Sequence, residues 1–343
     1  PYILRQWDKG QQVICERNEN YFGNKPQFKQ VTLLYLDEDA KMSAVKSGKV
    51  DMAKVDYTYA DTKVNGMTMK EIQSVENIGI CFPIPEPSTT TVDGKEIKVG
   101  HAVTSDIAIR KAFNVGFSRQ EMIQGLMNGY GTAAYTGYEQ MPWNDGSTIA
   151  DGNLDEAKKI LSDAGWVDTD GDGIIEKNGV KAEFDLIYTS NTGVRQSFAV
   201  YIGDNASKLG IKVNPVYKTW DEAEELKYYT PVVLSWGEHS PQLMFNLLHS
   251  SMACNGFNNT GCYKNATVDK HMNDALMSTT DDEANENWKK TIWDGQTGFG
   301  YQGDAAWAWY MNTNHIYFIR DGLDIGSVQP QPHGGAILKN ITD

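Results

Sequence analysis

Short apolar runs alternate with helical stretches in the second half of the chain, and this alternation constrains the fold more than any other feature. Residues 184–188 form an apolar run of strand length, and residues 194–209 then carry apolar side chains at helical spacing before Gly210. The next strand-like run begins at residue 211, and another covers residues 232–236. Strands separated by amphipathic helices are typical of parallel α/β sheets. The sequence therefore predicts an α/β fold.

A similar pattern occurs near the start of the chain. Residues 31–36 are a continuous apolar run, which predicts a strand buried on both faces. We expect a short helix to follow and to end at Gly48, and residues 50–53 to resume as a strand. Residues 2–4 and 13–15 flank a turn signal and predict a hairpin.

The chain is too long for one small core, because its 343 residues exceed the length at which single domains usually divide. No stretch has the composition of a linker. We therefore expect two lobes and expect the chain to cross between them in ordinary strands, near residue 104 and again near residue 303. Helices dominate between the crossings, where Ser118 and Glu121 have the spacing of a capping box and an apolar stripe ends at Gly165.

The charge of the chain excludes one class of partner. It has 45 acidic and 31 basic residues, a formal net charge of −14, and no run of Lys and Arg. Nucleic-acid binding requires clustered cations, so we expect no nucleic acid partner and take the acidity to serve solubility. No run of apolar residues has the length of a membrane span. The chain starts at Pro1 without a signal segment, and we expect any targeting segment to have been lost.

Four cysteines divide into a pair and two single residues. Cys254 and Cys262 bracket a loop rich in turn residues, which is compatible with a local disulfide in an oxidising compartment. Cys15 and Cys81 each lie in a short apolar run, and we expect both to be buried free thiols. None of the four has CxxC spacing, so the sequence contains no zinc or redox motif of that type.

Residues 168–176 contain three aspartates that alternate before a glycine, as at the start of a calcium loop. The twelfth position of such a loop should be a bidentate Glu, and it is Gly179 here. The candidate ligands of a structural Ca²⁺ are Asp168, Asp170, Asp172 and Glu176. The alternative is an acidic hairpin turn that binds no ion, and we favour it. We therefore predict that added calcium stabilises the protein little.

Motifs of the common catalytic sites are absent from the sequence. It contains no GxSxG, P-loop or GxGxxG, and no recognisable pair of a nucleophilic cysteine and a histidine. Its six histidines show neither HExxH nor another close metal-binding pair. We therefore expect a protein that is not an enzyme and that holds no catalytic cofactor.

The segment after residues 232–236 is the strongest candidate for a ligand site. It reads Trp-Gly-Glu-His-Ser and follows a strand that we expect to be buried. α/β folds bind ligands at the carboxyl ends of strands, and aromatic residues beside small or polar ones often line a cleft. The predicted ligand-binding residues of this segment are Trp236, Glu238, His239 and Ser240. The further candidates are Asn246, His249, Asn258, Asn259, Trp143 and His333.

Several phrases of the sequence occur in the order that they have in one known family. They are residues 1–4 with 17–26, residues 47–51, residues 106–113 with 118–119, residues 164–176, and residues 263–269. The second phrase reads Ser-Gly-Lys-Val-Asp, and the fourth reads Ala-Gly-Trp and runs into the acidic segment. On these phrases the chain resembles the bacterial extracellular solute-binding proteins of family 5, the peptide and nickel class of ABC importers. The resemblance covers the whole chain and implies that the first part of the usual protein is missing before Pro1.

The resemblance implies a two-lobed periplasmic-binding-protein fold of type II, with a hinge between the lobes. Residues 1–103 and 304–343 would form the first lobe, which is incomplete, and residues 104–303 the second. A ligand closes such lobes because it binds the closed form better, and the closed form docks on the membrane permease of the importer. The resemblance also implies a monomer outside the cytoplasm, either periplasmic or lipid-anchored at the cell surface.

The resemblance leaves the ligand open between two kinds. Peptide-binding members of the family carry an Asp three residues after the Trp of the ligand loop, where it pairs with the amino terminus of the peptide. That position is His239 here, and imidazole is a poor partner for ammonium, although Glu238 precedes it. Nickel-binding members carry a histidine further along, where this chain has Ala253, with His249 nearby but out of register. His333 lies where some members have a cleft-facing histidine.

Three functions follow as hypotheses. The leading one is a binding subunit that captures a small peptide-like ligand, or nickel or another metal as a chelate, and delivers it to the permease. The alternative keeps the fold and binds an oligosaccharide or a signalling peptide, which the Trp content of the chain supports. The third is a secreted hydrolase, which the absence of catalytic motifs disfavours.

Overall fold

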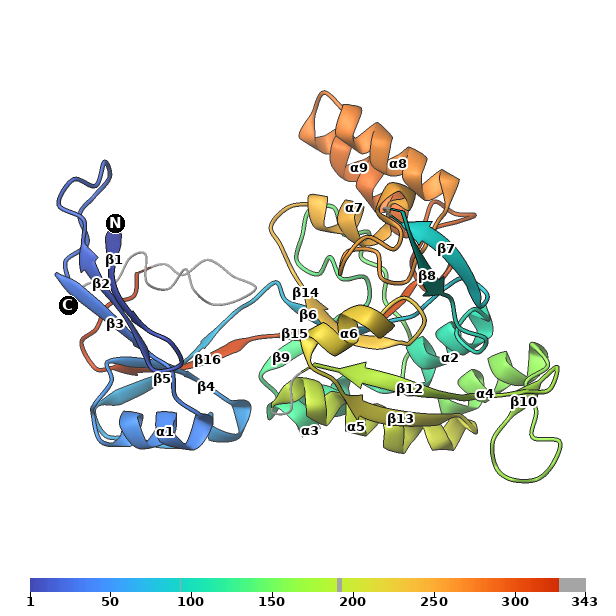
Figure 1. Ribbon diagram of the computed structural model, residues 1–343, viewed down its shortest axis with the longest axis horizontal. Helices are drawn as coiled ribbons and strands as arrows, with labels where there is room; N and C mark the ends of the chain where they lie inside the picture. The colour runs from blue at the N-terminus through green and yellow to red at the C-terminus, as the bar shows by residue number, and fades with distance from the viewer. Residues whose placement is uncertain (93, 190–192, 327–343) are drawn as a thin grey trace. The chain divides into compact units, whose positions relative to one another are not determined.

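The computed structural model describes residues 1–92, 94–189 and 193–326. The chain forms two compact units, one built from Pro1–Ser74 together with the chain from Asn314 onward, and one built from Val75–Thr313. Figure 1 shows the helices and strands of both. Within the described part of the chain, we find no helix with both the length and the apolar character needed to cross a bilayer.

The described residues of the smaller unit form two three-stranded antiparallel sheets and one α-helix. The first sheet has the order β1 (Tyr2–Asp8), β2 (Gln12–Arg17), β3 (Gln30–Leu34). The second has the order β4 (Met52–Val55), β16 (His315–Arg320), β5 (Met67–Ile72). Helix α1 (Glu38–Lys46) begins at Asp37, whose carboxylate accepts from the backbone N–H of Ala40. A short 3₁₀ helix covers Tyr57–Tyr59.

Two predictions for this unit are wrong and the predicted hairpin is confirmed. The hairpin of β1 and β2 forms as expected, with Trp7 opposite Val13. β3 is not buried on both faces: four of its five residues are exposed. Nor do β3 and β4 share a parallel sheet, because β4 pairs antiparallel with β16 from the far end of the chain. A continuous apolar run in the sequence does not by itself show that a strand is buried on both faces.

The larger unit is built on a mixed six-stranded sheet with the order β13-β12-β14-β6-β15-β9. β12 (Glu183–Tyr188) runs parallel to both β13 (Lys212–Tyr217) and β14 (Val232–Trp236). This part confirms the predicted α/β fold, because the amphipathic helix α5 (Val194–Ala206) connects β12 to β13. The antiparallel part of the sheet contains β6 (Asn77–Cys81), β15 (Trp307–Thr313) and β9 (Gly131–Ala133).

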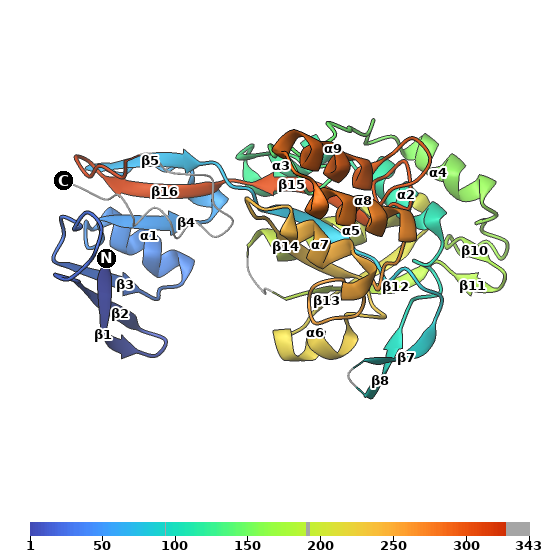
Figure 2. The same ribbon diagram turned by 90° about the horizontal axis from the view of Figure 1, so that it is seen from above.

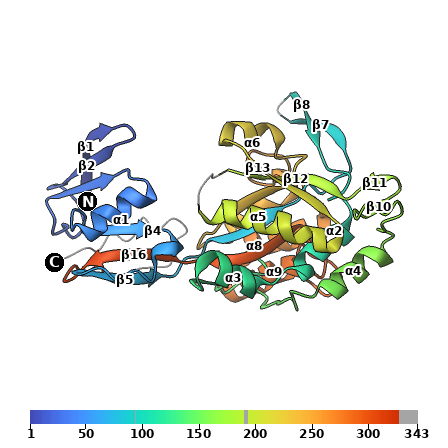
Figure 3. The ribbon, with the colours of Figure 1, turned by 90° about the horizontal axis from the view of Figure 1, so that it is seen from below.

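Helices cover both faces of this sheet. Alternate side chains of a strand point to opposite sides, so each face can pack on its own helices. Trp307 and Trp309 of β15 stack on each other and belong to a core cluster with residues of α7, α8 and α9. Tyr310 points the other way and packs on Phe198 of α5. Figures 1 and 2 show α8 and α9 side by side, and Figure 3 shows α2, α3 and α5 on the opposite face. The bounds of these helices are α2 (Ile107–Gly116), α3 (Arg119–Met127), α7 (Gln242–Leu248), α8 (Ala266–Met277) and α9 (Asp281–Ile292).

Smaller elements complete the larger unit. They are α4 (Leu154–Asp163), α6 (Trp220–Leu226), the hairpin β7 (Ser88–Val92)–β8 (Lys95–Val99), the hairpin β10 (Glu176–Lys177)–β11 (Val180–Lys181), and 3₁₀ turns at Ser207–Leu209 and Ser250–Met252. Ser118 caps α3 through the N–H of Glu121, as its spacing predicted. Gly165 has φ of +88° directly after α4, which is the left-handed conformation that glycine tolerates at a helix end.

The boundaries of the compact units differ from the predicted crossings. The chain divides between Ser74 and Val75 and between Thr313 and Asn314, not near residues 104 and 303. The reason is that β6 and β15 pair with each other and with β14 inside the larger sheet. That these two units are the lobes that close on a ligand stays a prediction.

The pairing of the cysteines agrees with the sequence analysis. Cys254 and Cys262 form a disulfide. Cys81 is a buried free thiol on β6, as expected, and burial raises its pKa to about 12. Cys15 is also free, but it is only half-buried.

Candidate functional site

The carboxyl ends of three parallel strands define one edge of the larger sheet. β12 ends at Tyr188, β13 at Tyr217 and β14 at Trp236. Because parallel strands point the same way, the segments that follow them gather at this edge (Figure 1). The predicted ligand loop, residues 236–240, lies here, in the position where open α/β sheets bind ligands.

Trp236 and Gly237 anchor the start of this loop. Trp236 is the last residue of β14 and lies opposite Asn77 of β6. Its indole Nε1 is buried and, within the described residues, has no hydrogen-bond acceptor. A Cβ on Gly237 would lie 2.0 Å from the carbonyl oxygen of Val75, so only glycine fits between the loop and the neighbouring strand. The loop is therefore held at a fixed distance from the start of β6.

The next three residues, Glu238, His239 and Ser240, are exposed. Ser240 accepts from the backbone N–H of Gln242 and thereby helps to start α7. Two titratable side chains and one hydroxyl are thus presented on a short loop between a fixed strand end and a helix. Such a loop can contact a polar solute without rearranging the core.

Arg195 is the residue at this edge that the sequence analysis missed. It lies in the first turn of α5, where its Nε donates to Ser235 Oγ at 3.0 Å. Its Nη2 is 3.7 Å from Glu76 Oε1, and its guanidinium lies 5.8 Å from the ring centroid of Trp220. Burial lowers the pKa of Arg195, and Glu76 opposes that shift. The signal that would have found it is an Arg in the first turn of the helix that follows β12.

Aromatic rings lie at the same edge of the sheet as this arginine. Trp220 begins α6 and is 46% exposed, with its ring edge-to-face with Phe257 at 5.1 Å. The rings of Tyr188 and Tyr217, at the ends of two adjacent strands, are 5.9 Å apart. Flat aromatic surfaces beside a cation and a carboxylate can hold a ligand that has both apolar and charged parts.

Two of the predicted polar candidates serve the local structure. His249 ends α7, and its Nδ1 accepts from the backbone N–H of Ser251. Its ring stacks on Phe245 with centroids 4.1 Å apart. Asn259 is buried, donates to the carbonyl of Tyr263 and accepts from the N–H of the same residue. These contacts occupy one face of the His249 ring and both polar atoms of the Asn259 amide. That either residue binds a ligand stays a prediction, and the geometry does not favour it.

The other candidates are dispersed. Asn246 lies on α7 and accepts from Gln242. Asn258 is half-buried in the loop that the disulfide closes. Trp143 is buried in the core cluster of the larger unit, edge-to-face with Tyr138. His333 lies outside the described residues. The structure thus brings together the 236–240 segment and Arg195, but not the whole predicted set.

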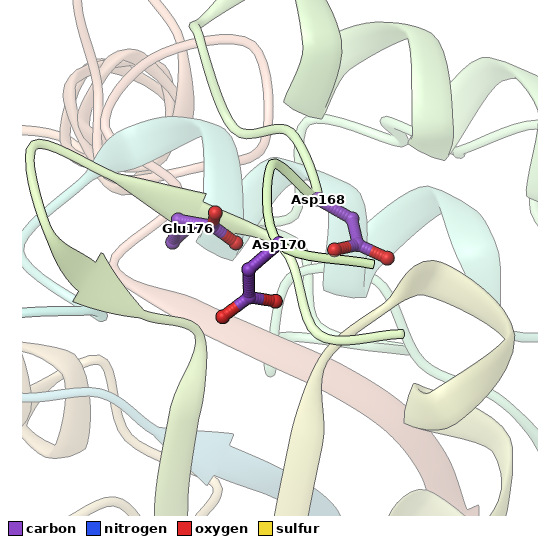
Figure 4. Close-up of side chains that lie close together, drawn as sticks. All are labelled: Asp168, Asp170 and Glu176. Carbon is purple, nitrogen blue, oxygen red and sulfur yellow. The ribbon is translucent and has the colours of Figure 1, made fainter. Parts of the chain in front are cut away.

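The acidic segment fits a turn better than a calcium site. One carboxylate oxygen each of Asp168, Asp170 and Glu176 lies within 4.8 Å of the others, whereas Asp172 is not part of this group. Figure 4 shows these three side chains close together. Asp168 accepts from the backbone N–H groups of two glycines of the turn. The ammonium of Lys181 binds both Asp170 and Asp172, so a cation from the protein itself already pairs with two of the four carboxylates of this segment.

The comparisons with known proteins settle the family. A model of the bacterial extracellular solute-binding proteins, family 5 Middle, matches residues 1–258. The chain belongs to this family. It is 28% identical over 330 residues to Protein XP55 of Streptomyces lividans, covering 94% of this chain and 57% of that protein. It is 26% identical over 285 residues to the oligopeptide-binding protein AppA of Bacillus subtilis, covering 80% of this chain and 50% of AppA.

The fold of this family also matches the structure. NikZ from Campylobacter jejuni, solved in complex with Ni(L-His), superposes with a TM-score of 0.82 at 19% sequence identity and covers 100% of this chain. This chain covers 68% of NikZ and about half of the curated relatives that it matches. The predicted family and the predicted α/β binding-protein fold are therefore confirmed.

Proposed function

We propose that this chain is part of the solute-binding subunit of an ABC importer, which captures a solute outside the cytoplasm and delivers it unchanged to a membrane permease. The observation that carries the proposal is the gathering of Arg195, Trp220 and the 236–240 loop at the carboxyl edge of the larger sheet. Membership of a family of extracellular solute-binding proteins supports it. We propose a monomer, periplasmic or lipid-anchored, without a catalytic role and without a resident cofactor.

The ligand that we propose is a small peptide-like solute or a chelate of nickel or another metal. The name of AppA supports the first and the bound Ni(L-His) of NikZ supports the second. Glu238 offers a carboxylate to an ammonium group, and His239 offers an imidazole to a metal chelate. Arg195 and Trp236 are further contacts: a guanidinium pairs with a ligand carboxylate, and the indole N–H lacks an acceptor among the described residues.

Isothermal titration calorimetry tests this proposal directly. The purified protein is titrated with Ni(L-His)₂ and with mixed di- and tripeptides, and one of these probes is expected to bind. The variants Trp236→Ala and His239→Ala should then weaken binding by at least about tenfold, which corresponds to one lost contact of about 1.4 kcal/mol. Glu286→Gln, which removes an exposed carboxylate of α9, is the control variant and should not change affinity.

Two outcomes would contradict the proposal. Unchanged ligand affinity in both Trp236→Ala and His239→Ala would show that the ligand does not bind at the proposed site. Turnover of a peptide or glycoside by the pure protein would show a hydrolase instead.

A second candidate is an oligosaccharide or signalling-peptide receptor of the same fold. The exposed ring of Trp220 beside Phe257 favours it, because sugars stack on exposed aromatic faces. The same calorimetric series with oligosaccharides separates the two candidates. Binding of an oligosaccharide that is lost in Trp220→Ala, without binding of peptides or Ni(L-His)₂, would establish the second.

A further inference from the structure

The disulfide of the larger unit closes a short loop, residues 254–262, which we call the bridged loop. At the base of this loop, the carbonyl oxygen of Asn259 accepts from the N–H groups of both cysteines, at 2.9 and 3.1 Å. Both cysteines have a positive φ, +58° at Cys254 and +51° at Cys262. Residues other than glycine rarely adopt this conformation, so a loop keeps it only where further interactions fix the backbone. The covalent bridge is such an interaction.

Phe257 lies in the middle of the bridged loop and is held from two sides. Its ring is edge-to-face with Trp220 of α6, with ring centroids 5.1 Å apart. The Nζ of Lys227, whose side chain is 1% exposed, lies 5.0 Å from the centroid of the same ring. The hydroxyl of Tyr228 donates to the carbonyl oxygen of Gly256 at 3.1 Å. Phe257 is therefore fixed between the start of α6 and the segment that follows this helix.

Helix α6 itself does little to hold Trp220. Trp220 is the first residue of this seven-residue helix and is 46% exposed, and Ala223 is the residue that the helix buries. A half-exposed indole can take several rotamers unless another side chain packs on it. Phe257 provides such packing, and edge-to-face pairs favour a defined relative orientation of the two rings. The orientation of the Trp220 ring thus depends on Phe257.

The other charged neighbour of Trp220 belongs to the proposed ligand site. The guanidinium of Arg195 lies 5.8 Å from the centroid of the Trp220 ring, and its Nε donates to Ser235 Oγ, next to Trp236. A continuous row of contacts therefore leads from the disulfide through Phe257 and Trp220 to the carboxyl edge of the sheet. Packed side chains of this kind can carry energetic coupling between separate positions.

We propose that the disulfide positions Trp220 for solute binding through Phe257, so that loss of the bridge weakens binding although both cysteines are buried away from the solute. Phe257 is a positioning residue in this arrangement. The consequence is a binding protein that is fully competent only where disulfides persist, as they do outside the cytoplasm. The effect on affinity rests on the proposed function, whereas the positioning of the indole is measured without any solute.

Fluorine NMR of the protein labelled with 5-fluorotryptophan measures the surroundings of the Trp220 ring. The chain has 9 tryptophans, and the variant Trp220→Phe identifies the resonance of Trp220. Cys254→Ser with Cys262→Ser should shift this resonance by more than its line width, because the ring of Phe257 then leaves the indole. Phe257→Leu keeps an apolar side chain without the ring and should also shift the resonance. Phe257→Tyr keeps the ring and should leave the resonance in place.

Calorimetry measures the consequence for binding. The probe is whichever of Ni(L-His)₂ and the di- and tripeptides binds the unmodified chain. The double serine variant and Phe257→Leu should each weaken its binding by about threefold to tenfold, the range expected for one lost edge-to-face contact. Phe257→Tyr should restore the affinity. Phe28→Leu is the matched control, because Phe28 is a half-buried phenylalanine of the smaller unit. It should change neither the Trp220 resonance nor the affinity.

Two results would overturn the inference. One is an unchanged Trp220 resonance in the double serine variant, which would mean that the bridge serves only the hairpin β7–β8, whose Val99 packs on both cysteines. The other is unchanged affinity of that variant for a probe whose binding is lost in Trp220→Ala. If none of the probes binds, the proposed function fails, and the Trp220 resonance alone then decides whether the bridge positions the indole.

Discussion

Replacing Arg119 with methionine should destabilise the larger unit strongly. The side chain of Arg119 is 1% exposed, and its Nη1 lies 3.0 Å from Asp151 Oδ2. Its Nε donates to the carbonyls of Ala134 and Trp309, at 2.7 and 3.0 Å. Methionine keeps much of the volume but removes the charge that pairs with Asp151 and the donor to these carbonyls, while the backbone N–H of residue 119 still donates to Asp151. Removing one partner of a buried ion pair costs about 3–5 kcal/mol, so we expect a loss of about 4 kcal/mol in the free energy of unfolding.

Urea unfolding followed by far-ultraviolet circular dichroism measures this loss. Asp151→Asn should cost less, about 1–2 kcal/mol, because the amide oxygen still accepts from Arg119. The matched control is Lys159→Met, which breaks the exposed pair of Lys159 with Asp163 on α4 and should leave the midpoint unchanged. A loss below about 1 kcal/mol for Arg119→Met would refute the reasoning, because it would mean that the surrounding groups find other partners at little cost.

Three further predictions follow from the structure. Replacing Cys254 and Cys262 with serine should lower the free energy of unfolding by about 2.5 kcal/mol, because the bridge closes a loop with a sequence separation of 8; an unchanged urea midpoint would contradict this. Burial raises the pKa of Cys81 to about 12, so alkylation followed by mass spectrometry should find this thiol unmodified in the native protein and modified after unfolding. Modification of Cys81 in the native protein would contradict its burial. Backbone N–H groups and His271 lower the pKa of Asp294 to about 2, so the contribution of Asp294 to stability should be complete above about pH 4 and be lost as the pH falls toward 2. Asp294→Asn should remove that part of the acid dependence of the unfolding midpoint. An unaltered pH profile would argue against the shift.

Calcium provides a test of the acidic loop. Because Lys181 already binds Asp170 and Asp172, addition of millimolar calcium should change the thermal midpoint by less than about one degree. A rise of many degrees that is lost in Asp168→Asn would contradict the assignment of this segment as a turn.

The parallel part of the fold could be predicted from the sequence because its signals are local. The helical periodicity of α5 and the apolar runs of β12 and β14 each lie within one stretch of chain, and the right-handed βαβ connection follows from them. The antiparallel partners could not be predicted in the same way. β4 and β16, or β6 and β15, are separated by more than 200 positions, and nothing in either strand encodes its partner. The boundaries of the compact units therefore lie elsewhere than the predicted crossings near residues 104 and 303.

The candidate site was predictable only where position along a strand determines it. The 236–240 loop follows directly from the end of β14. Arg195 was missed because its partners, Ser235 and Glu76, lie far from it in the sequence. His249 and Asn259 were chosen by residue type, which does not show that both side chains also make local hydrogen bonds; their ligand roles stay predictions.

The proposed ligand loop separates the residues that maintain the fold from those that would select a solute. Gly237 is constrained by the backbone of Val75, so Gly237→Ala should disturb the pairing of β14 with β6. The two residues that follow, Glu238 and His239, are exposed. Exposed positions tolerate substitution within about 0.5 kcal/mol. On the proposed site, exchanging these two side chains would change the solute at little cost in stability, while the glycine before them keeps the loop at the edge of the sheet.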